Sequence, residues 1–359
     1  IAEFTTLPGS RFPLESASDA DVGANSQLSY TLSPSEHFGL DLQRSEEYRE
    51  SLFLVLRKAL DRETMPVHRL VVTASDGGRP SLTGTMEVVI SVLDVNDNAP
   101  QFNQSVYKVQ LPESAAEGTL VARVNATDPD VGSNGEMTFT ASNIFPPKGL
   151  NLFILNPKTG EIRLMGALDF EDIRSYEIQI EATDKGTPPL SGHCKVMVEV
   201  LDVNDNAPEV WVTSLSVPVP EDAAVGTVVA LLSVSDRDSG ANGRVRCAVW
   251  PAAPFGLVAT FAGSYSLTTS LALVLTKSLD RETMPVHRLV VTASDGGRPS
   301  LTGTMEVVIS VLDANDNAPQ FNQSVYKVKV LEGSELGSLL IKLNATDLDE
   351  GINSDIMYL

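Results

Sequence analysis

Hydrophobic and polar residues alternate along most of the chain, which predicts β-strands. Residues 176–182 (YEIQIEA) place their apolar side chains on one face and their polar side chains on the other. In residues 86–92, Met86, Val88, Ile90 and Val92 alternate in the same way with Glu87 and Ser91. Turn sequences such as 76–78 (DGG), 134–135 (NG) and 185–188 (KGTP) separate these runs. No amphipathic helix of three turns stands out, so the chain is predicted to be all-β and antiparallel.

A repeated linker divides the chain into domains. The string DVNDNAP occupies residues 94–100 and 202–208, and returns as DANDNAP at 313–319, with spacings of 108 and 111 residues. This spacing fits one β-sandwich domain. We therefore expect sandwich repeats at 1–98, 99–206 and 207–317, followed by the truncated start of a further repeat at 318–359. That last segment lacks the later strands that would cover its apolar face, so it is expected to be poorly ordered or prone to aggregation.

Two long stretches of the sequence are also nearly identical, in addition to the repeated linkers. Residues 58–110 and 277–329 align without gaps and differ only at Ala59/Ser278, Val95/Ala314 and Gln110/Lys329. Tandem domains ordinarily diverge much further. A recent duplication, gene conversion and an assembly error would each explain the similarity.

The charge balance narrows the class of partner. The chain has 359 residues, with 47 Asp and Glu against 26 Lys and Arg, which gives a formal net charge of −21. Nucleic acid is a poor partner because phosphate binding needs clustered basic residues, whereas multivalent cations fit the acidic surplus. No apolar run reaches the roughly 20 residues of a membrane span, and no signal peptide is visible at Ile1.

The positions of the cysteines and histidines do not indicate a catalytic or metal-binding role. The two cysteines, Cys194 and Cys247, each lie in phase with valines of an alternating run, so both thiols are expected to pack in a core as inert groups. Two of the four histidines, His68 and His287, are copies within the same Val-His-Arg-Leu run, and we expect them at a strand surface or edge.

Acidic motifs recur in the same order in each full domain. A Glu comes near the start, a D-x-D pair precedes a turn, a D-x-E triplet follows, and an Asp ends a late strand before the linker. A single D-x-D is usually a solvated turn, but the recurrence of all these elements favours a common site. Such a density of carboxylate and carbonyl oxygens suits Ca²⁺, which takes six to eight oxygen ligands.

These motifs resemble those of cadherin ectodomain repeats over essentially the whole chain. The strings 56–63 (LRKALDRE), 125–128 (NATD) and 191–196 (SGHCKV) are similar to clustered protocadherins of the alpha type. The resemblance implies immunoglobulin-like Greek-key sandwiches joined end to end, with about three calcium ions at each complete junction. It aligns the first domain with the second repeat of a clustered protocadherin, with its N-terminus clipped. From the same resemblance, residues 207–317 are interpreted as a hybrid whose second half nearly duplicates residues 58–98.

Carried over position by position, the resemblance implies three sets of metal ligands. The first junction takes Glu3, Asp61, Glu63, Asn96, Asp97, Asp128, Asp130 and Asp184. The second takes Glu113, Asp169, Glu171, Asn204, Asp205, Asp236, Asp238 and Asp295. The third takes Glu221, Asp280, Glu282, Asn315, Asp316, Asp347 and Asp349, and its strand-end Asp would lie beyond Leu359.

The same resemblance implies calcium-dependent, homophilic cell–cell adhesion by part of a membrane-anchored ectodomain on the extracellular face of the plasma membrane. The expected partners are the same protein on an opposing cell, bound antiparallel through side faces of domains 1–98 and 99–206, and related protocadherins in cis. This fragment alone should self-associate weakly. Four sequons, at Asn103, Asn125, Asn322 and Asn344, permit glycosylation, and Asn103 and Asn322 are expected to be accessible.

Two other classes of function compete with this interpretation. Paired carboxylates also serve glycoside hydrolysis, but here they recur once per domain beside linkers, whereas an enzyme needs one special site. No nucleophile elbow, zinc-type cluster or phosphate-binding loop is present, so we expect no enzyme and no small-molecule substrate. A non-cadherin calcium adhesin would share the calcium sites and differ in its partner.

Overall fold

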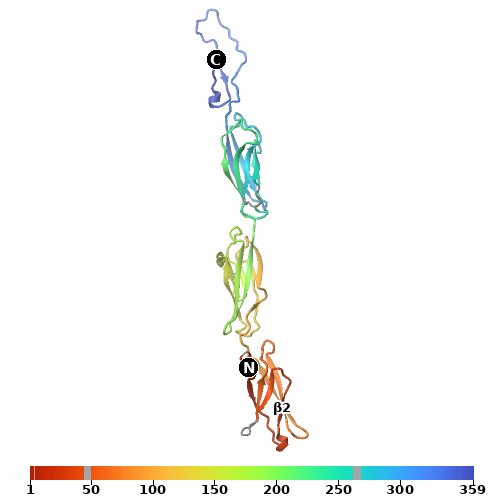
Figure 1. Ribbon diagram of the computed structural model, residues 1–359. Helices are drawn as coiled ribbons and strands as arrows, with labels where there is room; N and C mark the ends of the chain where they lie inside the picture. Colours follow the sequence, from red (N-terminus) through yellow and green to blue (C-terminus); the bar gives the residue numbers. More distant parts are fainter. Residues whose placement is uncertain (4, 44–49, 262–267) are drawn as a thin grey trace. The chain divides into compact units, whose positions relative to one another are not determined.

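Figure 1 shows a computed structural model that describes residues 1–3, 5–43, 50–261 and 268–359. The chain forms two compact units. The first comprises Ile1–Asp169 with Ile173–Leu201, and the second comprises Phe170–Asp172 with Asp202–Leu359. Both are built from β-sheets joined by turns, and the described residues contain only three short 3-10 helices as helical elements. The prediction of an all-β fold is confirmed.

The first repeat of the first unit packs two three-stranded sheets against each other. Their orders are β1-β4-β3 and β2-β5-β6, and every pairing is antiparallel. The core between them contains Phe38, Leu54, Leu56, Leu70 and Ile90. The elements are β1 Arg11–Leu14, η1 Gly23–Ser26, β2 Ser29–Leu32, β3 Phe38–Gln43, β4 Ser51–Leu56, β5 Val67–Ser75 and β6 Thr83–Ser91.

The second repeat of this unit contains a four-stranded sheet of order β11-β14-β15-β8 and a three-stranded sheet of order β12-β13-β9. Strand β8 joins β15 in parallel, whereas the other pairs are antiparallel. In β14 every second side chain is buried, as its alternation predicts. The elements are β7 Gln101–Phe102, β8 Val106–Pro112, β9 Leu120–Arg123, β10 Ala126–Thr127, β11 Met137–Phe145, η2 Pro147–Asn151, β12 Phe153–Leu155, β13 Glu161–Leu164, β14 Ser175–Asp184 and β15 Ser191–Leu201.

The second unit repeats this plan with two four-stranded sheets, β16-β18-β21-β20 and β17-β23-β22-β19. Its C-terminal segment adds only the two-residue pairing of β24 with β25, and Leu331 and Leu336 are 83% and 106% exposed there. The elements are β16 Glu209–Leu215, β17 Val219–Pro220, β18 Val228–Ser235, β19 Arg246–Trp250, β20 Phe255–Phe261, β21 Thr268–Leu275, β22 Val286–Ser294, β23 Thr302–Leu312, β24 Gln320–Phe321, β25 Ala345–Thr346 and η3 Gly351–Ser354. The assignment of this segment to the start of a further repeat stays a prediction.

The near-identical blocks pack differently in the two units. On β23, Val307 belongs to the core and Met305 packs against it. On β6, the equivalent Val88 is half-buried and Met86 is exposed. The cause is the edge of the sheet. Strand β16 packs on β23 in the second unit, and no strand is described in the equivalent place beside β6, where the bridge from Ala2 to Leu93 matches the pairing of β17 with β23. Of the four apolar residues in the alternating run 86–92, only Ile90 and Val92 are therefore buried.

The placement predicted for His68 and His287 is wrong, because both side chains are buried. They are 5% and 7% exposed, and they pack edge-on against Phe38 and Phe255 with ring centroids 5.2 and 5.3 Å apart. In the strand Val67–Ser75, His68 shares the inward phase with Leu70 and Val72, whereas Val67 and Val71 face outward. The phase of the strand, and not the polarity of the residue, decides its burial.

The cysteines lie close to the predicted places. Cys194 is buried at the centre of β15, and burial raises the pKa of its thiol to about 11. Cys247 on β19 is half-buried and packs against the core of the second unit, and burial raises its pKa as well. A raised pKa keeps a thiol protonated and unreactive at neutral pH, which agrees with inert packing.

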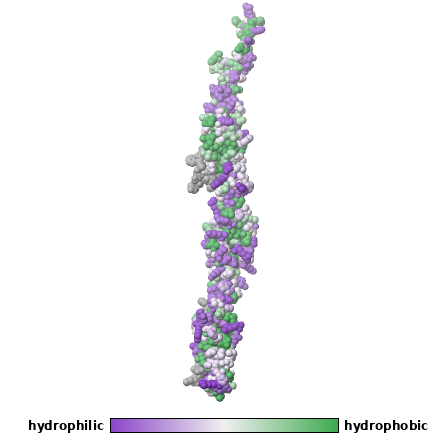
Figure 2. Space-filling view, turned by 90° about the vertical axis from the view of Figure 1, so that its right-hand side faces the viewer, coloured by the Kyte–Doolittle hydropathy of each residue, from purple (hydrophilic) through white to green (hydrophobic). Residues whose placement is uncertain are grey.

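The visible face in Figure 2 mixes small hydrophobic patches with hydrophilic residues. The sequon residues Asn103, Asn125 and Asn322 are exposed, as accessibility for glycosylation requires. No helix among the described residues has both the length and the apolar character that crossing a bilayer demands.

Candidate metal centres at the repeat junctions

Glu3 fixes the start of the first junction. Its backbone N–H donates to the carbonyl of Leu93, which brings the residue to the end of the sheet, and its side chain is only 1% exposed. One carboxylate oxygen accepts the backbone N–H of Val95 at 3.1 Å, and the other accepts that of Arg62 at 2.5 Å. Glu3 therefore ties the linker to the loop that carries Asp61 and Glu63.

The D-x-E loop presents its two acidic side chains differently. Asp61 accepts the backbone N–H and the hydroxyl of Thr64 at 2.9 and 2.8 Å, and these bonds lower the pKa of its carboxyl. Burial raises the pKa of Glu63, and the negative charge of Glu3 adds to the rise. The loop thus fixes the carboxylate of Asp61 by hydrogen bonds and places the carboxylate of Glu63 close to that of Glu3.

Two asparagines of the linker, Asn96 and Asn98, donate hydrogen bonds to the second repeat. Asn98 donates to Asp130 from its backbone N–H at 3.3 Å and from its side-chain amide at 2.8 Å. Asn96 donates its amide to Asp184 at 3.2 Å and to the carbonyl of Pro188 at 2.7 Å. Asp184 and Asp130 are 4% and 6% exposed, so carboxylates of the second repeat lie buried against the linker.

The first junction passes a direct test of fit for a hard cation. Single oxygens of Glu63, Asp97 and Asp130 lie within 4.8 Å of one another. Burial raises the pKa of Asp97 and of Asp128, and neighbouring carboxylates raise both further. The side-chain oxygens Asn96 Oδ1 and Asp128 Oδ2 are buried and have no hydrogen-bond partner among the described residues. Buried oxygens without a donor are costly unless a cation satisfies them, and an all-oxygen set suits Ca²⁺.

The third junction repeats the arrangement of the first within the second unit. Glu221 accepts the backbone N–H groups of Ala314 and Arg281 at 2.6 and 2.7 Å, and its oxygen lies within 4.8 Å of those of Asp280 and Glu282. Asp349 accepts the backbone N–H and the amide of Asn317, and its own backbone N–H donates to Asp347 at 3.1 Å. Burial raises the pKa of Asp316. Asn315 is exposed and makes no side-chain hydrogen bond in the described part of the chain.

The residues predicted for the second junction are divided between the units. Glu113 and Asp169 belong to the first unit. Glu171, Asn204, Asp205, Asp236, Asp238 and Asp295 belong to the second unit. Within the second unit the amide of Asn204 donates to Asp295 at 3.0 Å, and Asn204 Oδ1 and Asp236 Oδ2 are buried without a described partner, as at the first junction. The joining of the two halves stays a prediction.

The first Asp of each linker is a functional residue that sequence reasoning missed. Asp94 accepts the backbone N–H of Val131 at 3.2 Å and the amide of Asn134 at 2.8 Å, so it anchors the turn after the D-x-D pair. Asp202 and Asp313 accept the amides of Asn242 and Asn353 in the same way. The signal was present in the sequence, because an Asn follows each of these aspartates at the same separation of 40 residues.

Arg62 was missed as well. Its guanidinium pairs with Asp94 and Glu63 and donates to the carbonyl of Pro129 in the second repeat at 2.8 Å. Arg281 makes the equivalent contacts, donating to the carbonyl of Leu348 at 3.0 Å. The arginine of the D-R-E triplet therefore bridges two repeats directly. The corresponding triplet at the second junction carries Phe170.

Replacing Arg62 by Phe, the residue of the second triplet, is expected to loosen the first junction in calcium-free protein. The change removes hydrogen bonds to charged groups, each worth about 1–3 kcal/mol, and leaves Asp94 without its cation. The measurement is the distance distribution between spin labels placed in the first and second repeats. Arg69→Phe is the control, because Arg69 lies on an exposed strand surface and its one ion pair among the described residues is with Glu87. A distribution as narrow in Arg62→Phe as in Arg69→Phe would contradict the bridging role.

This arrangement of sandwich repeats with carboxylates gathered at their linkers defines a cadherin-type chain. The family model for the cadherin domain matches residues 6–93, 107–201 and 215–312. The chain belongs to the cadherin family. Calcium binding at the junctions and homophilic adhesion are general properties of this family, and its protocadherin members are adhesion proteins, not enzymes.

Within the family the chain is similar to clustered protocadherins. It is 53% identical over 352 residues to protocadherin alpha-5 of Homo sapiens, covering 98% of this chain and 37% of that protein. It is 52% identical over 351 residues to protocadherin alpha-13 of Pan troglodytes, covering 98% and 36%. Among solved structures, the extracellular cadherin domains 1–5 of protocadherin gamma B2 match with a TM-score of 0.90 and 40% identity, covering 99% of this chain and 65% of that one. The chain thus spans little more than a third of the length of these curated relatives.

Proposed function

We propose that this chain mediates calcium-dependent, homophilic cell–cell recognition as part of a protocadherin ectodomain, and that calcium fixes the angle between its repeats. The ligands would be the three sets named above, with Asp94, Asp202 and Asp313 holding the adjoining turns. The observation that best supports this proposal is the buried Asp128 Oδ2, which has no hydrogen-bond donor among the described residues and lies near the carboxylates of Asp94, Asp130 and Asp184.

Charge explains why the junction needs a cation. The first junction gathers seven carboxylates, and like charges about 4 Å apart repel by roughly 4 kcal/mol per pair at an effective dielectric of 20. Three divalent ions, the number expected from the family, would nearly neutralise that set. Bound calcium would supply positive charge, and the carboxylate and amide oxygens would coordinate it, without any chemical step. Because Glu63, Asp97 and Asp130 come from the first repeat, the linker and the second repeat, satisfying them together requires one fixed arrangement.

The partner is expected to be a second copy of the protein on an opposing cell, with related protocadherins as partners in cis. The family supports adhesion, and one structural relative is described as a "Protocadherin gammaB7 EC3-6 cis-dimer structure". The ectodomain would stand on the extracellular face of the plasma membrane.

A cell-aggregation assay with the intact parent ectodomain tests this function. Cells that display it should aggregate in calcium, disperse on chelation, and separate from cells that display a different protocadherin alpha ectodomain. Aggregation that mixes freely with those cells would favour a calcium adhesin without homophilic specificity. Aggregation that persists in chelator would contradict the proposal.

A further inference from the structure

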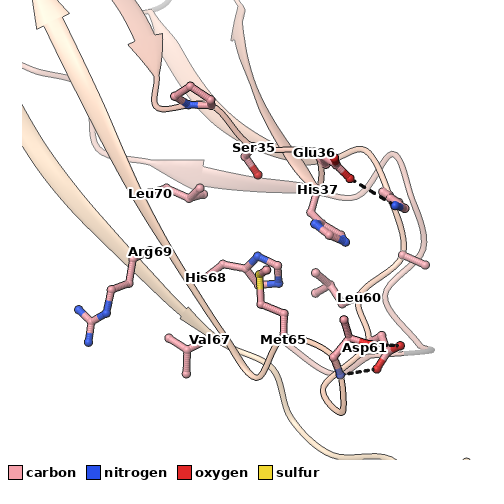
Figure 3. A pocket seen from close by; sticks show the side chains of 14 residues that line it. Ser35, Glu36, His37, Leu60, Asp61, Met65, Val67, His68, Arg69 and Leu70 are labelled. Atoms are coloured by element: carbon pink, nitrogen blue, oxygen red, sulfur yellow. Dashed lines mark hydrogen bonds and ion pairs between the residues drawn. The ribbon is translucent and has the colours of Figure 1, made fainter.

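A depression in the first repeat brings together two of the chain's four histidines. Figure 3 shows His37 and His68 within it, with Glu36, Asp61 and Met65 along its walls. His37 immediately precedes β3, whereas His68 lies on β5, so the two rings come from opposite sheets of the sandwich. Neither residue belongs to the acidic sets at the linkers.

The spacing of the two rings fits a shared metal ion. Their centroids lie 5.0 Å apart and their planes are inclined by 59°. Two imidazoles on one tetrahedral Zn²⁺, with Zn–N bonds of about 2.0–2.1 Å, place their ring centroids roughly 5 Å apart. His68 is 5% exposed, and its Nε2 is buried without a hydrogen-bond partner among the residues described. Burial and the nearby His37 lower the pKa of His68, which keeps the imidazole in the neutral form that metals bind.

The second unit offers an internal comparison. His287 occupies the equivalent position in the near-identical block, packs against Phe255 as His68 packs against Phe38, and also has a buried Nε2 without a described partner. Burial of one such histidine is thus a feature of the block itself. The residue before Phe255 is Pro254, where the first repeat has His37. Only the first repeat presents a second imidazole.

We propose that His37 and His68 form a binding site for a borderline divalent transition metal, of which Zn²⁺ is the probe, separate from the calcium junctions. Imidazole nitrogen suits Zn²⁺, whereas Ca²⁺ takes oxygen ligands, so the two sites select different ions. Water completes the shell. A bound metal would link β5 to the start of β3 and so clamp the two sheets together.

Calorimetric titration of the tag-free chain with ZnCl₂ at saturating calcium tests the site, together with the thermal midpoint of the first repeat. One zinc equivalent is expected to bind and to raise that midpoint. His37→Ala, a change at a half-buried loop position, should weaken this binding at least about tenfold, since even loss of an outer-shell partner costs about 10- to 100-fold. His68→Gln should do the same, and His287→Gln should leave binding unchanged.

Three outcomes would overturn the proposal. Wild-type protein that binds no zinc at saturating calcium would exclude the site. Equal zinc binding by wild type and His37→Ala would exclude the shared imidazole pair, whether or not His68→Gln folds. Zinc binding that is lost in Asp97→Ala but kept in His37→Ala would place the ion at the calcium junction.

Discussion

Asp97→Ala is expected to weaken calcium binding at the first junction at least roughly tenfold, or about 1.4 kcal/mol, and to free the angle between the first two repeats. Asp97 lies in the linker, and its oxygen is within 4.8 Å of oxygens of Glu63 and Asp130, which belong to different repeats. Burial raises the pKa of Asp97, and the charges of Glu3 and Asp130 raise it further, so this carboxylate lies among other negative charges. If Asp97 is a calcium ligand as proposed, its removal takes away an oxygen that lies between the two repeats.

Calcium titration and spin-label distances across the junction measure this effect. Asp41→Ala is the matched control, because it removes one carboxylate from a strand surface where Asp41 pairs with Arg11 at 3.1 Å. It should change neither quantity. Equal calcium affinities for the two variants would show that Asp97 is not a ligand.

Ile180→Ala is expected to destabilise the second repeat by about 2–5 kcal/mol. Ile180 lies in the middle of β14, is 0% exposed, and is paired with Cys194 of β15 and Ala141 of β11. Truncation removes buried methyl groups and leaves a cavity between the sheets. For a domain of this size each kcal/mol lowers the thermal midpoint by about 4–8 °C.

Scanning calorimetry at saturating calcium measures this loss as a lower midpoint for the transition that includes the second repeat. Gln179→Ala is the control, since its partly exposed side chain points to the opposite face of β14. A shift of similar size in both variants would show that burial within β14 is not what stabilises the repeat.

The fold could be predicted from the sequence because strand alternation is a local property. The inward phase of β14 is visible in residues 176–182 and survives in the structure. The exposure of Met86 was not predictable in this way, because the identical residue Met305 packs against the core in the second unit. Neighbouring strands at the sheet edge decide the difference, and alternation within one strand carries no information about them.

The candidate site was predictable to the extent that its residues recur. Carboxylates such as Asp97 and Asp130 stood out because their motifs return at each linker, and the structure brings their oxygens together. Asp94 recurs at every linker too, and its partner Asn134 follows at a constant separation, whereas Arg62 recurs only in the near-identical block and only three-dimensional structure pairs it with Pro129. His68 was misplaced because polarity suggested a surface position, whereas its phase in β5 directed it inward.

Small-angle X-ray scattering of the chain in saturating calcium and in excess chelator tests most directly whether calcium fixes the angles between repeats. Ion binding stabilises only the arrangement that presents all the ligands together. Chelation should therefore change the maximum dimension and the scattering profile, while circular dichroism continues to report folded β-sandwiches. An unchanged maximum dimension and profile would contradict the account.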